Sequence, residues 1–267
     1  MGVYSPENEL IPMGNWASTE SIHIKSIAHY TSIPTFLKIL QTKCFRFNRI
    51  DNVNDLEEKE FLQQNDNYRR TFISCFTDYT RESIPMWKIY TTPETGIMLK
   101  IKFAQGRAVD ELFEKSTMYA NTSTVFPIDS GDAKKLMNSA WRVKLSVGKI
   151  NYTDKRIPTS LRVGEENKYY DIPDYFGLEK RTAWKYEREL RYRAIIRAAQ
   201  VNTPAEFEEI GSLFGKINFS AIDKITVVFN PWINKEDWVS VLKAAIKEQK
   251  IDTQIDFRNS SLYKKIR

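Results

Sequence analysis

The sequence predicts an α+β fold in which central, mostly antiparallel sheets carry flanking helices. Three segments in the middle of the chain alternate between apolar and polar residues, with the period of two that is typical of a β-strand. Helical signals lie around these segments without a regular strand–helix–strand repeat, which favours α+β over α/β. The three alternating segments are Gly96–Phe103, Val143–Tyr152 and Glu189–Ile196.

Local signals predict the N-terminal elements. Ile27–Tyr30 is expected to form a short strand, and Ser32 is placed to cap a helix whose first turn holds Pro34. Phe45–Asn48 predicts another strand. Asn54 is expected to open a second helix, because acidic residues follow it where the helix dipole favours negative charge.

Two elements are expected before the alternating strand at Gly96, and one after it. Thr71–Phe76 (TFISCF) is short, apolar and β-rich, so it predicts a strand. A helical stretch then carries Trp87 and Tyr90. Asp132 is expected to begin another helix after the strand.

The later two alternating strands each have a predicted inner face. In the first, the residues expected to face the core are Val143, Leu145 and Val147. In the second, Leu190, Tyr192, Ala194 and Ile196 lie opposite Glu189, Arg191, Arg193 and Ile195.

The C-terminal third is expected to close the sheet. Thr203–Glu206 has the pattern of a capping box with proline at the first helical position, and Ile225–Phe229 (ITVVF) suits a central strand. Asn234 is expected to cap the last helix, and Gln254–Phe257 to form the last strand. The buried stripe of that helix is predicted to be Trp238, Val241, Leu242, Ala245 and Ile246.

The chain is expected to form one domain. Its 267 residues lie at the upper end of single-domain size, and no Pro/Gly-rich linker divides them. We expect an N-terminal arm at 1–24 and a single domain at 25–267.

The composition favours a cytoplasmic protein without a membrane partner. The two cysteines, Cys44 and Cys75, are too few for a disulfide framework and are interpreted as small core residues. Met1–Ile24 lacks the basic and apolar regions of a signal peptide. No apolar window is long enough to span a bilayer.

Several common chemistries lack their residues. The two histidines are His23 and His29, and there is no Gly-x-Ser-x-Gly elbow for a serine hydrolase. No glycine-rich phosphate loop is present. The histidines and cysteines are spaced unlike a zinc site, so no metal is expected.

The formal net charge of +6 permits a phosphate-rich partner but does not require one. Basic side chains gather at Arg188–Arg193 and Lys264–Arg267 and are scattered elsewhere. Lys180, Arg181, Lys185 and Arg188 are interpreted as solvated charges.

Three segments stand apart from these general features. They are Ala28–Ser32 (AHYTS), a block from Phe72–Thr77 through Met86, Trp87 and Tyr90 to Gly96, and Trp184–Arg191 (WKYERELR). In this order they resemble a large bacterial family defined as domain-of-unknown-function family 2971. The resemblance covers roughly Ile27 to Leu262. Two positions depart from the family pattern: Leu56 stands where proline is preferred, and Thr95 where a histidine is common.

The same order has a more distant resemblance to the ADP-ribosyltransferase superfamily, whose substrate is NAD. That resemblance implies that His29, with Tyr30 and Thr31 beside it, holds the ribose of NAD, and that Tyr90 or Trp87 stacks on nicotinamide. It also implies a late glutamate that stabilises the oxocarbenium-like state as nicotinamide leaves. Glu187 and Glu189 are the candidates. Two residues apart on a strand, they would share a face with Arg191, which could bind a phosphate.

Plainer interpretations of the same residues stay open. His29 could donate a hydrogen bond at a strand end, and Trp87 and Tyr90 could pack in the core. The acidic and basic row from Glu187 to Arg193 could be a solvent-facing row paired to a neighbouring strand.

Three functions follow from these alternatives. The first is an NAD-dependent ADP-ribosyltransferase-like enzyme or NAD glycohydrolase that modifies a nucleic acid or protein, as a bacterial toxin or anti-phage defence effector. The second is a non-catalytic nucleic-acid-binding module that uses Arg188, Arg191 and Arg193. The third is a protein that acts through partner binding. The sequence predicts no oligomeric state.

Overall fold

The computed structural model describes residues 3–4, 10–11, 24–63, 66–121, 134–135, 141–154, 176–198 and 210–265. The helices are α1 (Ile33–Thr42), α2 (Leu56–Gln63), α3 (Ile84–Tyr90) and α5 (Glu236–Glu248). Short 3₁₀ helices are η3 (Ile50–Asn52), η4 (Asp66–Arg70), η5 (Val109–Glu111), η7 (Thr182–Glu187) and η8 (Phe219–Ala221).

The strands make up most of the described fold. They are β1 (Val3–Tyr4), β2 (Leu10–Ile11), β3 (Ser26–Ser32), β4 (Cys44–Arg49), β5 (Thr71–Thr77), β6 (Gly96–Phe103), β7 (Phe113–Asn121), β8 (Lys134–Lys135), β9 (Trp141–Lys149), β10 (Asn151–Tyr152), β11 (Glu179–Lys180), β12 (Glu189–Ala198), β13 (Ser212–Ile217), β14 (Ile222–Phe229) and β15 (Gln254–Arg258).

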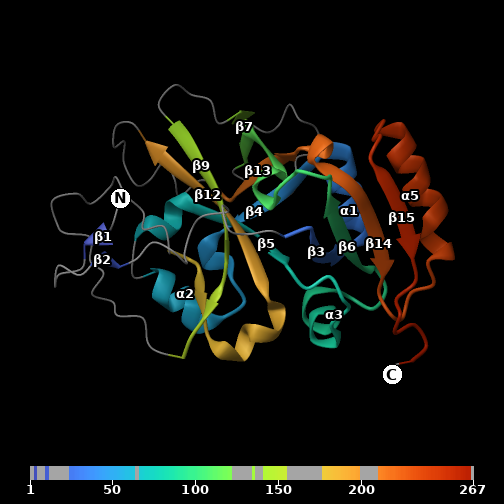
Figure 1. Ribbon diagram of the computed structural model, residues 1–267, viewed down its shortest axis with the longest axis horizontal. Coiled ribbons are helices and arrows are strands. Elements are labelled where there is room, and N and C mark those ends of the chain that lie inside the picture. Colours follow the sequence, from blue (N-terminus) through green and yellow to red (C-terminus); the bar gives the residue numbers. More distant parts are fainter. Residues whose placement is uncertain are drawn as a thin grey trace.

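Eleven of these strands form one mixed but mostly antiparallel sheet, so the predicted α+β class is confirmed (Figure 1). Its main path runs β15-β14-β6-β3-β5-β4-β13-β7-β8, and β12 adds to β5 and carries β9 on its far side. Within this sheet the pairing of β14 with β15 is parallel, as expected for two strands joined through a helix.

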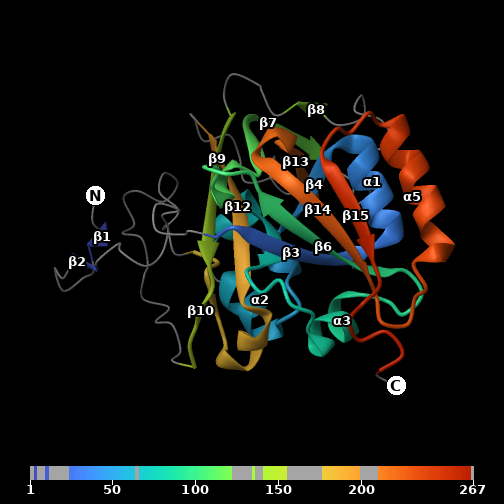
Figure 2. The ribbon, with the colours of Figure 1, turned by 45° about the vertical axis from the view of Figure 1, so that its right-hand side comes forward.

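The two faces of the central strands pack against different helices. Alternate residues of β6 point to opposite faces, so Leu99 joins the main core cluster, to which α1 and α5 contribute Phe36 and Leu242. Met98 joins a second cluster with Trp87 of α3. Figures 1 and 2 show α1 and α5 together at one end of the sheet and α3 apart from them.

Capping explains why two helices begin where they do. The Ser32 side chain accepts a hydrogen bond from the Thr35 backbone N–H at 3.2 Å, and proline follows in the first turn of α1, as predicted. At α2 the predicted cap, Asn54, is wrong by one residue. Asp55 precedes the helix, and its side chain accepts a hydrogen bond from the Glu57 N–H at 3.0 Å. Arg181 also donates to the Asp55 carboxylate and holds it in this position.

Most predicted strands are confirmed, with one interruption. The segment predicted as one strand at 143–152 divides at Ile150 into β9 and β10, because the Ile150 N–H bonds to the Glu189 carbonyl and Asn151 turns to Leu178. Val147 is buried as predicted.

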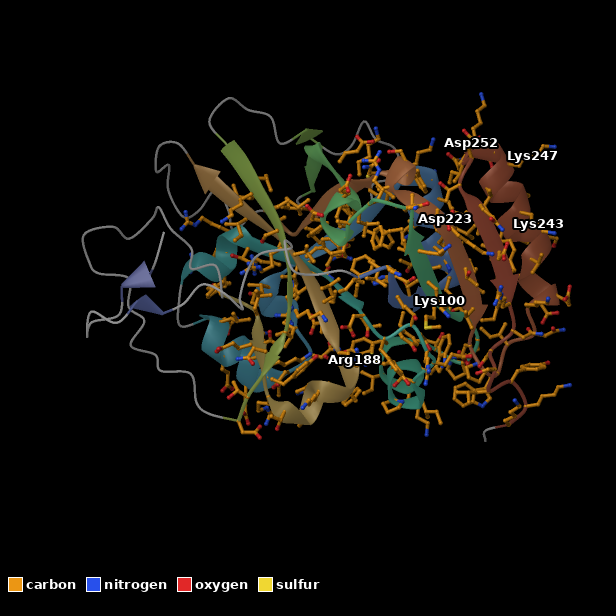
Figure 3. All side chains as sticks on the ribbon, in the orientation of Figure 1. Lys100, Arg188, Asp223, Lys243, Lys247 and Asp252 are labelled. Atoms are coloured by element: carbon orange, nitrogen blue, oxygen red, sulfur yellow. The ribbon has the colours of Figure 1, made fainter. Side chains whose placement is uncertain are left out.

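The C-terminal helix differs from its prediction at two positions. It begins at Glu236, with the Asn234 side chain accepting weakly from the Glu236 N–H at 3.4 Å. Val241 is 47% exposed rather than buried, because only Leu242 of this stretch points fully into the core. Figure 3 shows Lys243 and Lys247 of α5 at the outer edge of the molecule.

Two predicted helices lie wholly or mostly outside the described residues. The helix expected from Asp132 lies mostly outside the described residues, and Lys134–Lys135, which are described, form strand β8 instead. The helix expected at Thr203–Glu206 lies outside the described residues, as does most of the arm expected at 1–24. Within that arm β1 and β2 pair antiparallel.

The sheet forks at β5, and this fork positions the candidate site. One edge of β5 pairs with β12 from Thr71 to Thr77. The other edge pairs with β4 at Phe72 and Ile73 and with β3 only at Thr77. Among the described residues, no strand pairs with this edge between those points, so β3 and β4 diverge there.

The length and apolar character of the described helices decide whether one of them could span a membrane. None of them is both long enough and apolar enough to cross a bilayer. The longest, α5, has 13 residues, well short of the roughly 20 that a span needs.

Candidate functional site

A cavity of about 280 Å³ lies at the fork of the sheet. Its wall includes residues of β3, β4 and β5, the last turn of α3 and the junction of η7 with β12. The side chains on the wall that carry chemistry are His29, Tyr30, Arg46, Asn48, Asn52, Asn54, Cys75, Tyr90, Lys180, Glu187, Glu189 and Arg191. Six of the eight residues predicted as site residues therefore lie in one cavity.

His29 links β3 to β5 at a point where these two strands are not paired through their backbones. Its Nδ1 lies 2.8 Å from the carbonyl oxygen of Cys75, on the edge of β5 that has no strand partner at this point. The imidazole thus takes the place of the backbone N–H that a neighbouring strand would supply. Burial lowers the pKa of His29, against the smaller raising effect of this hydrogen bond. The ring is therefore neutral at pH 7, with Nδ1–H as donor and Nε2 as an acceptor.

Cys75 differs from its prediction as a core residue. Cys44 is buried, but Cys75 is exposed in the cavity. Surrounding protein atoms and the nearby Glu189 carboxylate nevertheless raise the pKa of the Cys75 thiol well above its ordinary value. The thiol is thus protonated at neutral pH and is a poor nucleophile.

Glu187 and Glu189 meet, although the predicted reason is wrong. Glu187 is the last residue of η7 rather than part of the strand, and Arg188 follows with a left-handed φ of 45°. The chain enters β12 only at Glu189. Both carboxylates reach the same amine, since Lys180 Nζ lies 2.6 Å from Glu187 Oε2 and 3.4 Å from Glu189 Oε2.

Lys180 is consequently not the solvated charge that the sequence suggested. Its side chain is 4% exposed, and its ammonium group also lies 4.6 Å from the centre of the Trp184 ring. Burial would lower the pKa of Lys180, but the attraction of Glu189 and Glu187 outweighs it and raises the pKa. The amine is therefore charged and holds both carboxylates in place.

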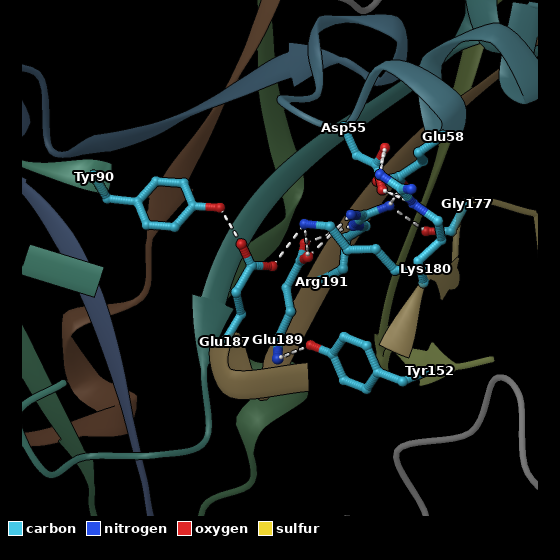
Figure 4. Close-up of polar contacts among 10 residues, drawn as sticks. Asp55, Glu58, Tyr90, Tyr152, Gly177, Lys180, Glu187, Glu189 and Arg191 are labelled. Atoms are coloured by element: carbon cyan, nitrogen blue, oxygen red, sulfur yellow. Dashed lines mark hydrogen bonds and ion pairs between the residues drawn. The ribbon is translucent and has the colours of Figure 1, made fainter. Parts of the chain in front are cut away.

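Glu189 is engaged on both oxygens. Arg191 Nε and Nη2 donate to its two oxygens at 2.7 and 3.0 Å, a bidentate geometry that is among the strongest available to a carboxylate (Figure 4). Burial alone would raise the pKa of Glu189, but Arg191 and Lys180 overcome this effect and hold the pKa at about 2. Glu189 is therefore ionised and has little capacity for another ligand.

Arg191 is itself fixed from behind. Its Nη1 donates to Glu58 Oε1 and to the Gly177 carbonyl, both at 2.6 Å. Glu58, from α2, has a second carboxylate oxygen that is buried without a hydrogen-bond partner, and burial raises its pKa. Arg191 is thus a structural cation, although it was predicted to bind a phosphate.

Glu187 retains more freedom than Glu189. One oxygen accepts a hydrogen bond from the Tyr90 hydroxyl and the other from Lys180 (Figure 4). A carboxylate has about four lone-pair sites, so Glu187 can accept a further hydrogen bond. Burial raises its pKa, and Lys180 and Tyr90 oppose this rise.

The other aromatic candidates divide between cavity and core. Tyr30 lines the cavity, and its hydroxyl accepts from the Ser83 N–H at 3.1 Å. Trp87 is 1% exposed and packs edge-on to Tyr30, with ring centres 4.9 Å apart. Trp87 and Thr31 are buried outside the cavity wall. For Trp87 and Thr31 the core interpretation holds, because α3 and β3 direct these side chains into the protein interior.

Arg46 and the asparagines Asn48, Asn52 and Asn54 share the cavity wall, although none of them was predicted as a site residue. Arg46 and Asn48 alternate with the buried Phe45 and Phe47 along β4, so period two could have placed them on the opposite face from these phenylalanines. In the following loop, Asn52 carried no signal beyond turn formation, and Asn54 was predicted only as a helix cap.

Among the ranges that the structure describes, no group of three or more His, Cys, Asp or Glu side chains could hold a metal ion. The carboxylates of the cavity are instead neutralised by lysine and arginine.

No family model, no curated protein and no solved structure matches the chain. The resemblances noted from the sequence therefore stay predictions. The candidate site rests on the geometry of this chain alone.

Proposed function

We propose that the protein is an enzyme that cleaves NAD at the nicotinamide–ribose bond, with a fold and site similar to those of the ADP-ribosyltransferase superfamily. One observation carries the proposal. His29, Tyr90 and Glu187, which come from three segments far apart in the sequence, line a single cavity. Perturbed ionisable groups that converge in a cavity are more typical of functional sites than of ordinary cores.

The arrangement of strands supports the same proposal. β5 lies between the strand that carries His29 and the strand that begins with Glu189. The next helix along the chain, α3, carries Tyr90. Residues of the three sequence motifs therefore lie close together at the fork of the sheet.

In the proposed reaction the C–N bond between ribose C1′ and nicotinamide breaks, and nicotinamide leaves with the bonding electrons. Positive charge develops on the ribose, and the ionised form of Glu187, beside Lys180, stabilises it and accepts a hydrogen bond from a ribose hydroxyl. The oxygen or nitrogen of an acceptor then bonds to C1′ and loses its proton to solvent. Water as the acceptor gives NAD hydrolysis, and a macromolecule gives ADP-ribosylation.

The remaining groups have positioning roles. The neutral His29 offers Nε2 as an acceptor for another ribose hydroxyl, and the Tyr90 ring gives nicotinamide a surface for stacking. Glu189 is assigned to positioning rather than catalysis, because Arg191 and Lys180 occupy its oxygens. A cavity of about 280 Å³ is small for a whole dinucleotide, since drug-sized ligands occupy about 300–1,000 Å³. We therefore assign to it the nicotinamide–ribose half and the adjoining phosphate.

The test is incubation of the protein with NAD and mixed nucleic-acid and protein acceptors, followed by mass analysis. Release of nicotinamide, or an added ADP-ribose mass on an acceptor, is expected from the wild type. Glu187→Gln should reduce it by at least about 100-fold, as removal of one stabilising group in a water-excluded site typically does. Glu236→Gln, at an exposed glutamate of α5, is the matched control.

Undiminished activity in Glu187→Gln, Glu189→Gln and the double variant would refute the residue assignment. Loss only in Glu189→Gln would exchange the roles of the two carboxylates. Absence of any NAD turnover by the wild type would reject the proposed enzyme.

The cellular role follows from the proposed chemistry. An enzyme that consumes NAD or modifies macromolecules in the cytoplasm suits a bacterial toxin or anti-phage effector, and a net charge of +6 suits a nucleic-acid acceptor. The alternative of a non-catalytic nucleic-acid-binding module is less well supported. Of the three arginines on which it depends, Arg191 and Arg193 are each 1% exposed and offer no surface to a phosphate backbone, and Arg188 is exposed but paired with Asp78.

A further inference from the structure

Arg46 is a cation of the cavity wall that lacks a counter-ion. Its Nε is buried without a hydrogen-bond partner, and its guanidinium forms no ion pair with any residue that the structure describes. The other two cations of the wall differ in this respect, because Lys180 and Arg191 are each paired with carboxylates at 2.7 Å or less. Arg46 is thus the cation that is available to a ligand.

The side chains beside Arg46 are hydrogen-bond donors that are also available. Asn48 lies two residues along β4 and so on the same face of the strand. Asn52 and Asn54 complete this part of the wall, and all three amides are exposed. Within the described part of the chain, none of the three side chains makes a hydrogen bond. A guanidinium with several free amides is the donor set that binds phosphate.

An unpaired guanidinium in this position has an energetic cost. Burial removes solvent from it and lowers the pKa of Arg46, with no neighbouring carboxylate to oppose the effect. Arg46 is half-buried, and partial burial of a charge without a counter-ion costs some stability unless a ligand binds it. Residues kept against stability are characteristic of ligand sites.

We propose that Arg46 binds a phosphate group of a nucleotide ligand, with Asn48, Asn52 and Asn54 as additional donors. This inference rests on the proposed function in that it concerns the same cavity. It assigns the phosphates of the ligand to the β4 part of the wall and the ribose to Glu187. Arg46, rather than the predicted Arg191, is then the phosphate-binding arginine.

The test compares ligands that differ only by a phosphate. Isothermal titration would measure binding of nicotinamide mononucleotide against nicotinamide riboside, and of AMP against adenosine, with inorganic phosphate and a short oligonucleotide as separate arms. The wild type should bind at least one mononucleotide about 10- to 100-fold more tightly than its nucleoside, as expected for charged hydrogen bonds to one phosphate. Arg46→Gln should abolish that difference and leave nucleoside binding unchanged.

Three further variants control for charge, for side-chain geometry and for folding. Arg107→Gln removes an equal charge at a surface position paired with Glu111 and should leave every affinity unchanged. Arg46→Lys keeps the charge without the planar fork and should recover part of the phosphate preference. Arg46→Met should raise the unfolding midpoint, and an unfolding curve of each variant shows that it folds.

Each outcome decides the proposal. It is overturned if Arg46→Gln binds mononucleotides as the wild type does, if no phosphate-bearing compound binds the wild type, or if only oligonucleotide binding depends on Arg46. Dependence of mononucleotide binding on Arg46 without any NAD cleavage would support the phosphate site and reject the proposed enzyme. NAD cleavage with a KM unaffected by Arg46→Gln would support the proposed enzyme and reject the phosphate site.

Discussion

The Lys180 ammonium lies 2.6 Å from the Glu187 carboxylate, and both side chains are at most 4% exposed. This pair is the centre of a buried network in which Glu58, Glu187 and Glu189 face the two cations Lys180 and Arg191. Three carboxylates against two cations leave one negative charge in excess. The raised pKa values of Glu58 and Glu187 are consistent with one proton shared by this network.

Replacing Lys180 with methionine should destabilise the protein by about 3 to 5 kcal/mol, because it leaves two buried carboxylates without their common partner. Chemical denaturation at pH 7 measures this change. Lys216→Met is the control, since Lys216 pairs with Glu114 at a half-exposed site and should cost at most about 1 kcal/mol. Equal losses in the two variants would show that the buried network is not formed in solution.

The stability of the protein should depend on acid through Glu189. Its pKa is lowered in the folded state from 4.5 to about 2, so its contribution is complete above pH 4.5 and is lost as the pH falls from 4.5 towards 2. Glu189→Gln should therefore be less stable at pH 7 and should lose less further stability across this window. Denaturant titrations at several pH values give the slope for each protein. Parallel slopes would contradict the role given to Arg191.

Tyr90→Phe should shift the acid limb of NAD cleavage to higher pH. The Tyr90 hydroxyl donates to Glu187 and lowers the pKa of that carboxyl against the larger effect of burial. Without this donor the pKa of Glu187 rises further, and less of the ionised form remains. Nicotinamide release at pH 6 should fall by about 10-fold, the worth of one hydrogen bond to a charged group, and Tyr263→Phe outside the cavity should change nothing.

Gly177→Ala should disturb the support of Arg191. Gly177 has a φ of 71°, and an added Cβ would lie 2.1 Å from Ile50 Cδ1. Strain and overpacking together should cost at least about 2 kcal/mol. Gly106→Ala separates the two effects, since Gly106 has a φ of 75° with nothing near its Cβ position and should cost only about 1 to 2 kcal/mol. Thermal unfolding of both variants gives the comparison.

Strict period-two segments allowed the sheet to be predicted. β6 begins and ends where the alternation of Ile97, Leu99 and Ile101 does, because each face of that strand meets a different core cluster. Asn54 was taken as the cap of α2 because it precedes the acidic turn, but Asp55 gains a second partner in Arg181, far along the chain. Local sequence cannot register such a distant contact.

The sequence predicted which residues form the site better than it predicted which charged side chains are buried and paired. His29, Tyr90 and Glu187 carry recognisable motifs, whereas Lys180 looked like any solvated lysine because its partners are set by the turn at Arg188. Trp87 and Tyr90 share one helical pattern but lie in different environments. The Trp87 ring packs on Tyr30, and the Tyr90 hydroxyl donates to Glu187. Which side of a short helix faces the cavity depends on the tertiary packing of both faces.

The fork at β5 also bears on the order of folding. β5 meets β3 and β4, which precede it in the chain, and β12, whose residues follow more than a hundred positions later. Contacts of such long sequence separation form slowly, because the loop between them must close first. The cavity is thus completed only when β12 arrives, and a nascent chain that ends before Glu187 lacks its acidic wall. Ligand affinity would then be a late marker of maturation, gained in one step when β12 joins the sheet.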